Sequence, residues 1–135
     1  MKKTIFLALS MALIFIVGCG KSTSSDEQVA LDYINQYLNG TVEERQKFVS
    51  SKVHQDVKAI FELGASFVAD EDKKFLNPSV SKSTKYESEG TKGSLVLLTN
   101  DSEHEVIALI MEGKLGWVFN SDDKEAFDEM KNQFK

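Results

Sequence analysis

The spacing of apolar residues divides the chain into a helical part and a strand part. Between residues 26 and 68 apolar side chains recur at intervals of three and four, which is typical of amphipathic helices. From residue 79 the interval falls to two, which is typical of strands. The predicted helices cover about 26–39, 41–49 and 51–68, the predicted strands about 79–86, 94–99, 105–111 and 115–119, and a short helix follows. This order predicts an α+β fold: amino-terminal helices packed on a four-stranded antiparallel meander, with a short carboxy-terminal helix.

Two pairs of residues have the spacing of a helix-capping box. In such a box a Ser or Thr side chain and an acidic or amide side chain three positions later satisfy free N–H groups at the helix start. Ser25 with Gln28 is expected to open the first helix, and Thr41 with Glu44 the second. Gly40 is expected to end the first helix as a C′ glycine.

The carboxy-terminal half carries its own turn and cap signals. Residues 112–114 predict a tight hairpin turn, and Asn120 or Ser121 is expected to cap the last helix. The apolar side of that helix is predicted to hold Phe127, Met130 and Phe134, and the last strand is expected to show Leu115, Trp117 and Phe119 on one face.

The two inner strands are apolar on both faces. Alternation groups Val96, Leu98, Ile107, Leu109 and Met111 against Leu95, Leu97, Val106, Ala108 and Ile110. An antiparallel sheet with one wet face would alternate apolar and polar residues, so both faces require cover. The amino-terminal helices can cover one face. The other requires the last helix, a second copy of the domain, a partner protein or an apolar ligand, and the sequence leaves these alternatives open.

The amino terminus has the pattern of an export signal. Lys2 and Lys3 precede an uncharged apolar segment, residues 4–17, that is shorter than the ~20 residues of a membrane-spanning helix but fits the core of a secretory signal. The following Ile16-Val17-Gly18-Cys19 resembles the lipobox of bacterial lipoproteins. The resemblance implies cleavage between Gly18 and Cys19, a diacylglyceryl cysteine labelled by palmitate, and a lipid anchor on the extracytoplasmic side of the cell membrane.

This interpretation divides the chain into a signal peptide (1–18), a lipidated cysteine with a flexible tether (19–25) and a single α+β domain (26–135). Loss of the signal removes Lys2 and Lys3, leaving 14 basic and 21 acidic residues in 117, a net charge of about −7. Nucleic acid is therefore not an expected partner, because its phosphates are repelled by such a surface. Cys19 is the only cysteine, so no disulfide, thiolate metal site or cysteine nucleophile is available.

The element order is similar to that of the NTF2-like, cystatin-type fold of small bacterial lipoproteins. The similarity covers about residues 26–119 and includes the segments YLNG (37–40), FVS (48–50) and GKLGWVF (113–119). The helix after Phe119 departs from the simplest version of that fold. The resemblance implies a cone between helices and a bent sheet, which is an active site in some members and is filled or used for partner contact in others.

The sequence offers few residues for catalysis. His54 is expected on the surface of the third helix, and the group Asp101, Glu103, His104 and Glu105 is interpreted as a solvated turn. Residues 70–72 lack the order of a calcium loop. No metal, cofactor or catalytic set is predicted. Asp32, Tyr33, Tyr86 and Glu105 could meet in a cavity, although their spacing does not require it.

Tyr86, His104 and Trp117 are the candidates for a pocket or an interface, with Trp117 expected mainly in the core. Two functions are compatible with these patterns. The predicted one is a non-enzymatic lipoprotein of the bacterial envelope that contacts another protein, or a second copy of itself through the sheet. The alternative is a small-molecule binder or enzyme that uses the cone. A filled, apolar cone interior together with a bare hydrophobic sheet face favours the first function, and a large, water-filled pocket lined by converging Tyr, His and carboxylate groups favours the second.

Overall fold

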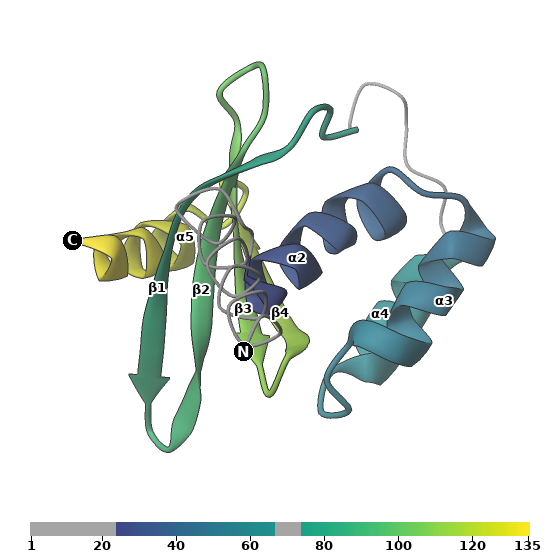
Figure 1. Ribbon diagram of the computed structural model, residues 1–135, viewed down its shortest axis with the longest axis horizontal. Coiled ribbons are helices and arrows are strands. Elements are labelled where there is room, and N and C mark those ends of the chain that lie inside the picture. The colour runs from purple at the N-terminus through teal and green to yellow at the C-terminus, as the bar shows by residue number, and fades with distance from the viewer. Residues whose placement is uncertain (1–23, 67–73) are drawn as a thin grey trace, which may run out of the picture.

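The computed structural model describes residues 24–66 and 74–135. In chain order its elements are α2 (Ser25–Asp32), the π-helix η1 (Tyr33–Leu38), α3 (Val42–Lys52), α4 (Lys58–Ala65), β1 (Ser79–Ser88), β2 (Thr91–Thr99), β3 (Glu105–Met111), β4 (Lys114–Asn120), α5 (Lys124–Lys131) and the 3₁₀ turn η3 (Asn132–Phe134). The strands form one antiparallel sheet in the order β1-β2-β3-β4. Figure 1 shows α2, α3 and α4 on one side of this sheet and α5 on the other. The α+β class and the four-stranded meander are confirmed.

The predicted signal, its cleavage site at Gly18 and Cys19, and residues 70–72 lie outside the described residues.

Two of the predicted helix caps are displaced and one is confirmed. Ser24, not Ser25, opens α2: the Ser24 hydroxyl accepts a hydrogen bond from the Glu27 N–H (3.2 Å), and the Glu27 carboxylate accepts one from the Ser24 N–H (3.0 Å). A run of two serines offers two capping hydroxyls, and the one three residues before a carboxylate is used. Thr41 and Glu44 form the expected box, with bonds of 3.2 and 2.9 Å.

The last helix is capped by Asp123, whose carboxylate accepts from the Ala126 N–H at 3.3 Å. The prediction of Asn120 or Ser121 was wrong, because the Asn120 side chain instead accepts from the Asp122 N–H (2.9 Å) and closes the preceding turn.

The first helix widens before it ends. The Asn39 N–H donates to the Ile34 carbonyl, five residues back, at 2.9 Å, as in a π-helix. Gly40 follows, but its φ is not positive, so it is not the left-handed C′ glycine that was expected. A Cβ at this position would lie 2.1 Å from the Gln36 carbonyl oxygen. Glycine is therefore required here because the backbone of the widened turn passes so close.

The predicted third helix does not begin at Ser51. α3 continues to Lys52, and α4 begins only at Lys58. Between them Val53 forms a parallel bridge with Leu115 of β4, and the His54 N–H donates to the Leu115 carbonyl at 2.8 Å. Val53 is fully buried, so tertiary pairing with the sheet replaces a helical turn at this point. The end of the predicted helix, residues 67–68, lies outside the described residues.

The sheet faces are grouped differently from the prediction. Val96 pairs with Ala108 and Leu98 with Val106. The helix-side face consequently holds Val96, Leu98, Val106, Ala108 and Ile110, and the opposite face holds Leu95, Leu97, Ile107 and Leu109. The turn sets this register: Asn100 accepts through its side chain from the N–H groups of Ser102 (2.9 Å) and His104 (3.0 Å). Alternation along each strand was correct, but it does not fix how two strands align.

Each face of the sheet has its own apolar cluster. The larger one lies between the sheet and the helices α2 to α4, and the smaller one lies between the sheet and α5. In the smaller cluster Phe127 and Met130 of α5 pack with Phe134 on the strands, as predicted for the apolar side of the last helix. The second face is therefore covered within the chain.

β4 carries a bulge that the sequence pattern did not reveal. Leu109 pairs with Trp117 and Ile110 with Leu115, so Gly116 has no partner in β3. The extra residue reverses the alternation. Leu115 therefore belongs to the helix-side cluster and Phe119 to the α5-side cluster, and the prediction of one shared face was wrong.

Candidate functional site

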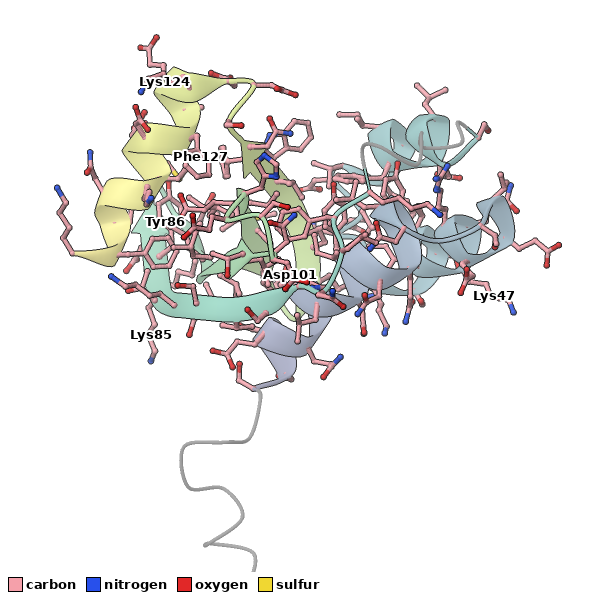
Figure 2. All side chains as sticks on the ribbon, turned by 90° about the horizontal axis from the view of Figure 1, so that it is seen from above. Lys47, Lys85, Tyr86, Asp101, Lys124 and Phe127 are labelled. Carbon is pink, nitrogen blue, oxygen red and sulfur yellow. The ribbon has the colours of Figure 1, made fainter. Side chains whose placement is uncertain are left out.

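The three candidate residues from the sequence do not form one site. Tyr86 lies on β1 in the cluster beneath α5, close to Phe127 (Figure 2). Trp117 lies on β4, at the opposite edge of the sheet. His104 is exposed in the turn that leads into β3. A pocket that uses all three is excluded by the order of the strands.

Trp117 is a surface residue, with 39% of its area exposed. Its ring stands edge-on to Phe61 of α4, with 6.0 Å between the ring centroids. The expectation that Trp117 lies in the core was wrong, because β4 is an edge strand and the bulge at Gly116 turns the following residues. Trp117 is instead the exposed end of an aromatic cluster.

That cluster fills the space between the helices and the sheet. Tyr33 and Tyr37 stack with 5.5 Å between centroids, and both contact Phe48 and Phe61. The Tyr37 hydroxyl donates to the Phe61 carbonyl at 2.8 Å. Burial raises the pKa of both tyrosines above the ordinary value of 10.0, so their hydroxyls stay protonated into alkaline solution.

The four residues considered for an acid–base cavity are also dispersed. Asp32 forms an ion pair with Lys52, and Glu105 pairs with Lys131 at 2.6 Å. Tyr33 lies in the helix-side cluster, whereas Tyr86 lies on the other face of the sheet. The sheet therefore separates the two tyrosines.

His54 occupies a position that sequence reasoning missed. It lies in the loop between α3 and α4 rather than on a helix, and only 12% of its side chain is exposed. Its Nε2 lies 2.8 Å from a Glu112 carboxylate oxygen, and its Nδ1 accepts from the Asp56 N–H at 3.2 Å. The pair ties the α3–α4 loop to the β3–β4 hairpin. Its members stand 58 positions apart, so no local pattern could reveal it.

Within residues 24–66 and 74–135, no group of three or more His, Cys, Asp or Glu side chains is arranged to hold a metal ion. In the turn around His104, Asp101 accepts a hydrogen bond from the Asn77 amide at 2.6 Å. This turn is a hydrogen-bonded connection between the start of β1 and the β2–β3 loop.

Two surface features have the properties of binding sites. The first is a group of exposed apolar side chains on α4 and β4, called the α4 patch: Ile60 (55% exposed), Leu63 (74% exposed) and Trp117. Ile60 and Leu63 are three positions apart on one helix, so they lie on the same side of it. Phe61, between them in sequence, contacts Trp117 and links the helix to the strand.

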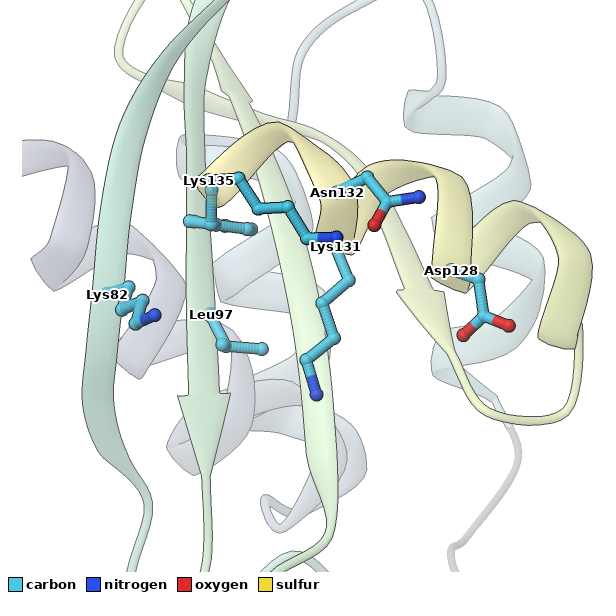
Figure 3. A pocket seen from close by; sticks show the side chains of 7 residues that line it. Lys82, Leu97, Asp128, Lys131, Asn132 and Lys135 are labelled. Carbon is cyan, nitrogen blue, oxygen red and sulfur yellow. The ribbon is translucent and has the colours of Figure 1, made fainter.

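The second feature is a groove of about 500 Å³ between the sheet and the end of α5, the lysine groove (Figure 3). Leu97 lies at its centre, with Lys82 of β1 on one side and Lys131 of α5 on the other. It is lined by Lys82, Leu97, Asp128, Lys131, Asn132, Phe134 and Lys135. Three lysines thus surround an apolar floor in a chain whose net charge is −5.

The fold defines an α+β domain with a meander covered on both faces. A scan against protein-family models, a search of curated proteins and a search of solved structures each gave no match to this chain. The NTF2-like resemblance accordingly stays a prediction. None of the helices in the described ranges is long and apolar enough to cross a membrane.

Proposed function

We propose that this chain is a lipid-anchored lipoprotein of the bacterial envelope and that its folded domain is a non-enzymatic module for contact with another protein. The observation that carries the proposal is the motif Ile16-Val17-Gly18-Cys19 after an uncharged apolar segment. A diacylglyceryl group on Cys19 would hold the chain at the bilayer, since each buried methylene contributes about 0.8 kcal/mol and two acyl chains anchor stably.

Palmitate labelling tests the anchor. The exported wild-type chain is expected to incorporate radiolabelled palmitate and to sediment with membranes. Cys19→Ala is expected to lose the label and to leave the membrane fraction. Gly20→Ala is the matched control, because it changes the neighbouring residue and keeps the sulfur. Wild type without label, or Cys19→Ala present in membranes at the wild-type level, would contradict the anchor.

The α4 patch supports contact with a protein. Large exposed apolar side chains that share one side of a helix, as Ile60 and Leu63 do, can mark a binding surface. Aromatic residues such as Trp117 are enriched in protein interfaces. The packing of the aromatic cluster behind the patch keeps α4 and β4 together, so the surface is preformed.

Photo-crosslinking tests this contact. A photoreactive amino acid at position 63 is expected to give a discrete adduct in the native membrane, whereas the same amino acid at the exposed position 124 on α5 gives none. Ile60→Lys in the position-63 chain should abolish the adduct, because it places a charge in the patch without touching the core. An adduct with a second copy of this chain identifies a homodimer, and one with another protein identifies an envelope partner. No adduct at position 63, or the same adduct at position 124, would reject the contact.

The alternative is a small-molecule binder or enzyme that uses the cone. It requires space between the helices and the sheet, where Tyr33, Phe48 and Phe61 are buried against one another. This packing argues against the cone site, whereas α5 covers the sheet face whose exposure would have favoured contact through the sheet.

A further inference from the structure

We propose that the lysine groove binds an anionic amphiphile, a molecule in which a phosphate or carboxylate head adjoins an apolar chain. This inference concerns the face of the sheet opposite the α4 patch, and it does not depend on the lipid anchor.

The position of Lys82 follows from strand geometry. Side chains two apart on a strand share a face, so Lys82, Thr84 and Tyr86 all point to the α5 side. In the β1–β2 register Lys82 lies directly opposite Leu97. The strand register thereby places the side chain of Lys82 at the groove, beside a buried apolar side chain.

The charges around the groove are not balanced. Lys131 pairs with Glu105 at 2.6 Å, and Asp128 pairs with Lys124 at 2.7 Å. Both carboxylates near the groove therefore have cationic partners already. Lys82 and Lys135 form no ion pair with any residue in the described ranges. The positive charge of Lys82 is therefore left to attract an anion, and lysine binds phosphate as a point charge.

The floor of the groove is apolar. Leu97 is buried, and Phe134 is half-buried at the end of η3, which packs against β1. The Asn132 amide adds a neutral polar group to the lining. A volume of about 500 Å³ lies within the usual range for small-molecule sites. An anion with no apolar portion would leave the exposed part of Phe134 in water, and a neutral apolar ligand would leave the ammonium groups without an anionic partner. An anionic amphiphile satisfies both features.

Nuclear magnetic resonance titration with dodecyl phosphate, below its micelle concentration, tests the proposal on the purified full chain in phosphatidylcholine nanodiscs. Saturable shifts are expected for Leu97 and Phe134. Lys82→Gln should weaken binding about fivefold, the effect of losing roughly 1 kcal/mol from one charge contact. Lys47→Gln, on α3 at the far end of the molecule (Figure 2), removes the same charge and should bind like wild type.

Four outcomes would overturn the proposal. These are the absence of saturable shifts, equal affinity of Lys82→Gln and Lys47→Gln, equal binding of zwitterionic dodecylphosphocholine, and equal binding of inorganic phosphate, which has no apolar chain. Phosphatidylglycerol in the discs distinguishes the source of the ligand. Shifts of Leu97 that it causes without added probe support a bilayer lipid, and shifts seen only with dodecyl phosphate support a free amphiphile.

Discussion

At the scale of single residues, Glu27 connects the start of the domain to its sheet. One carboxylate oxygen accepts from the Ser24 N–H at 3.0 Å, and the other accepts from the Ser83 hydroxyl at 2.7 Å. The Ser83 bond, followed by the Ser24 backbone bond, lowers the pKa of Glu27 below its ordinary value of 4.5. The ionised carboxylate therefore stabilises the folded chain above the unfolded pKa. That contribution is lost as the pH falls through the lowered pKa of the folded chain.

We predict that Glu27→Gln removes this pH dependence. At about pH 7 the variant should be less stable than wild type, and the difference should shrink as the pH falls toward about 3, because Glu27 loses its charge as the pH passes through its lowered pKa. Urea unfolding across that range measures it. Glu62→Gln, at an exposed site on α4, is the control and should track wild type. A constant difference between wild type and Glu27→Gln at every pH would contradict the assignment.

Residue-level features with partners close in sequence were predictable in kind, although the caps of α2 and α5 lie one to three residues from the predicted positions. The Thr41–Glu44 box is an example, since its partners are three positions apart. The bonds Glu27–Ser83 and His54–Glu112 span 56 and 58 positions. Such pairs exist only because the fold brings distant segments together, so no spacing rule could identify them.

At the scale of elements, α5 covers the second face of the sheet. Its buried residues Phe127 and Met130 pack on Leu95, Leu97 and Ile107. The Lys131–Glu105 pair at 2.6 Å adds a polar link from the end of α5 to the start of β3. The helix thus acts as part of the core rather than as an appendage.

Phe127→Ala is predicted to lower the free energy of unfolding by about 3 kcal/mol, the usual cost of truncating a buried phenylalanine. It should also increase the binding of an apolar dye, because the strand face beneath α5 becomes accessible. Urea unfolding and dye fluorescence measure the two effects. Glu125→Ala, on the exposed side of α5, should change stability by less than about 0.5 kcal/mol. A Phe127→Ala chain as stable as wild type would show that α5 does not hold the face closed.

The identity of the elements followed from the sequence, but their pairing did not. The period-two pattern located β2 and β3, whereas the turn around Asn100 decided that Val96 faces the same side as Ala108. In the same way the bulge at Gly116 moved Trp117 out of its predicted place. A shift of one residue reverses every face of a strand, and its cause lies in the partner strand and the turn.

At the scale of the whole molecule, two apolar clusters share one sheet. Leu95 and Val96 are neighbours in β2, yet one belongs to each cluster. Loss of either cluster therefore removes support from the strands that the other requires.

We predict a single cooperative unfolding transition. Fluorescence of Trp117, the only tryptophan, reports on the contact between β4 and α4, whereas far-ultraviolet circular dichroism reports on all elements. The two signals should give the same urea midpoint, as expected for a small two-state domain. Phe127→Ala should shift both midpoints equally, although Phe127 lies on the other face of the sheet from the aromatic cluster. Separate midpoints would mean that the clusters unfold independently.

The α4 patch and the lysine groove are also features of the whole molecule. The sequence singled out Tyr86, His104 and Trp117, and only Trp117 lies in one of the two surface features. The α4 patch joins α4 to β4, and the lysine groove joins β1 and β2 to α5 and η3. Each is assembled from segments far apart in the chain, so composition and spacing gave no sign of either.

The sequence by itself determined the α+β class, the order of helices and strands, the Thr41–Glu44 cap and the apolar side of the last helix. These depend on periodicity and on contacts within one helical turn, which the chain encodes locally. Only the tertiary structure decided the alignment of the strands, the burial of Tyr33, the exposure of Trp117 and the gathering of Lys82, Lys131 and Lys135 around Leu97. These depend on which distant segments meet, and that is settled by packing the whole domain at once.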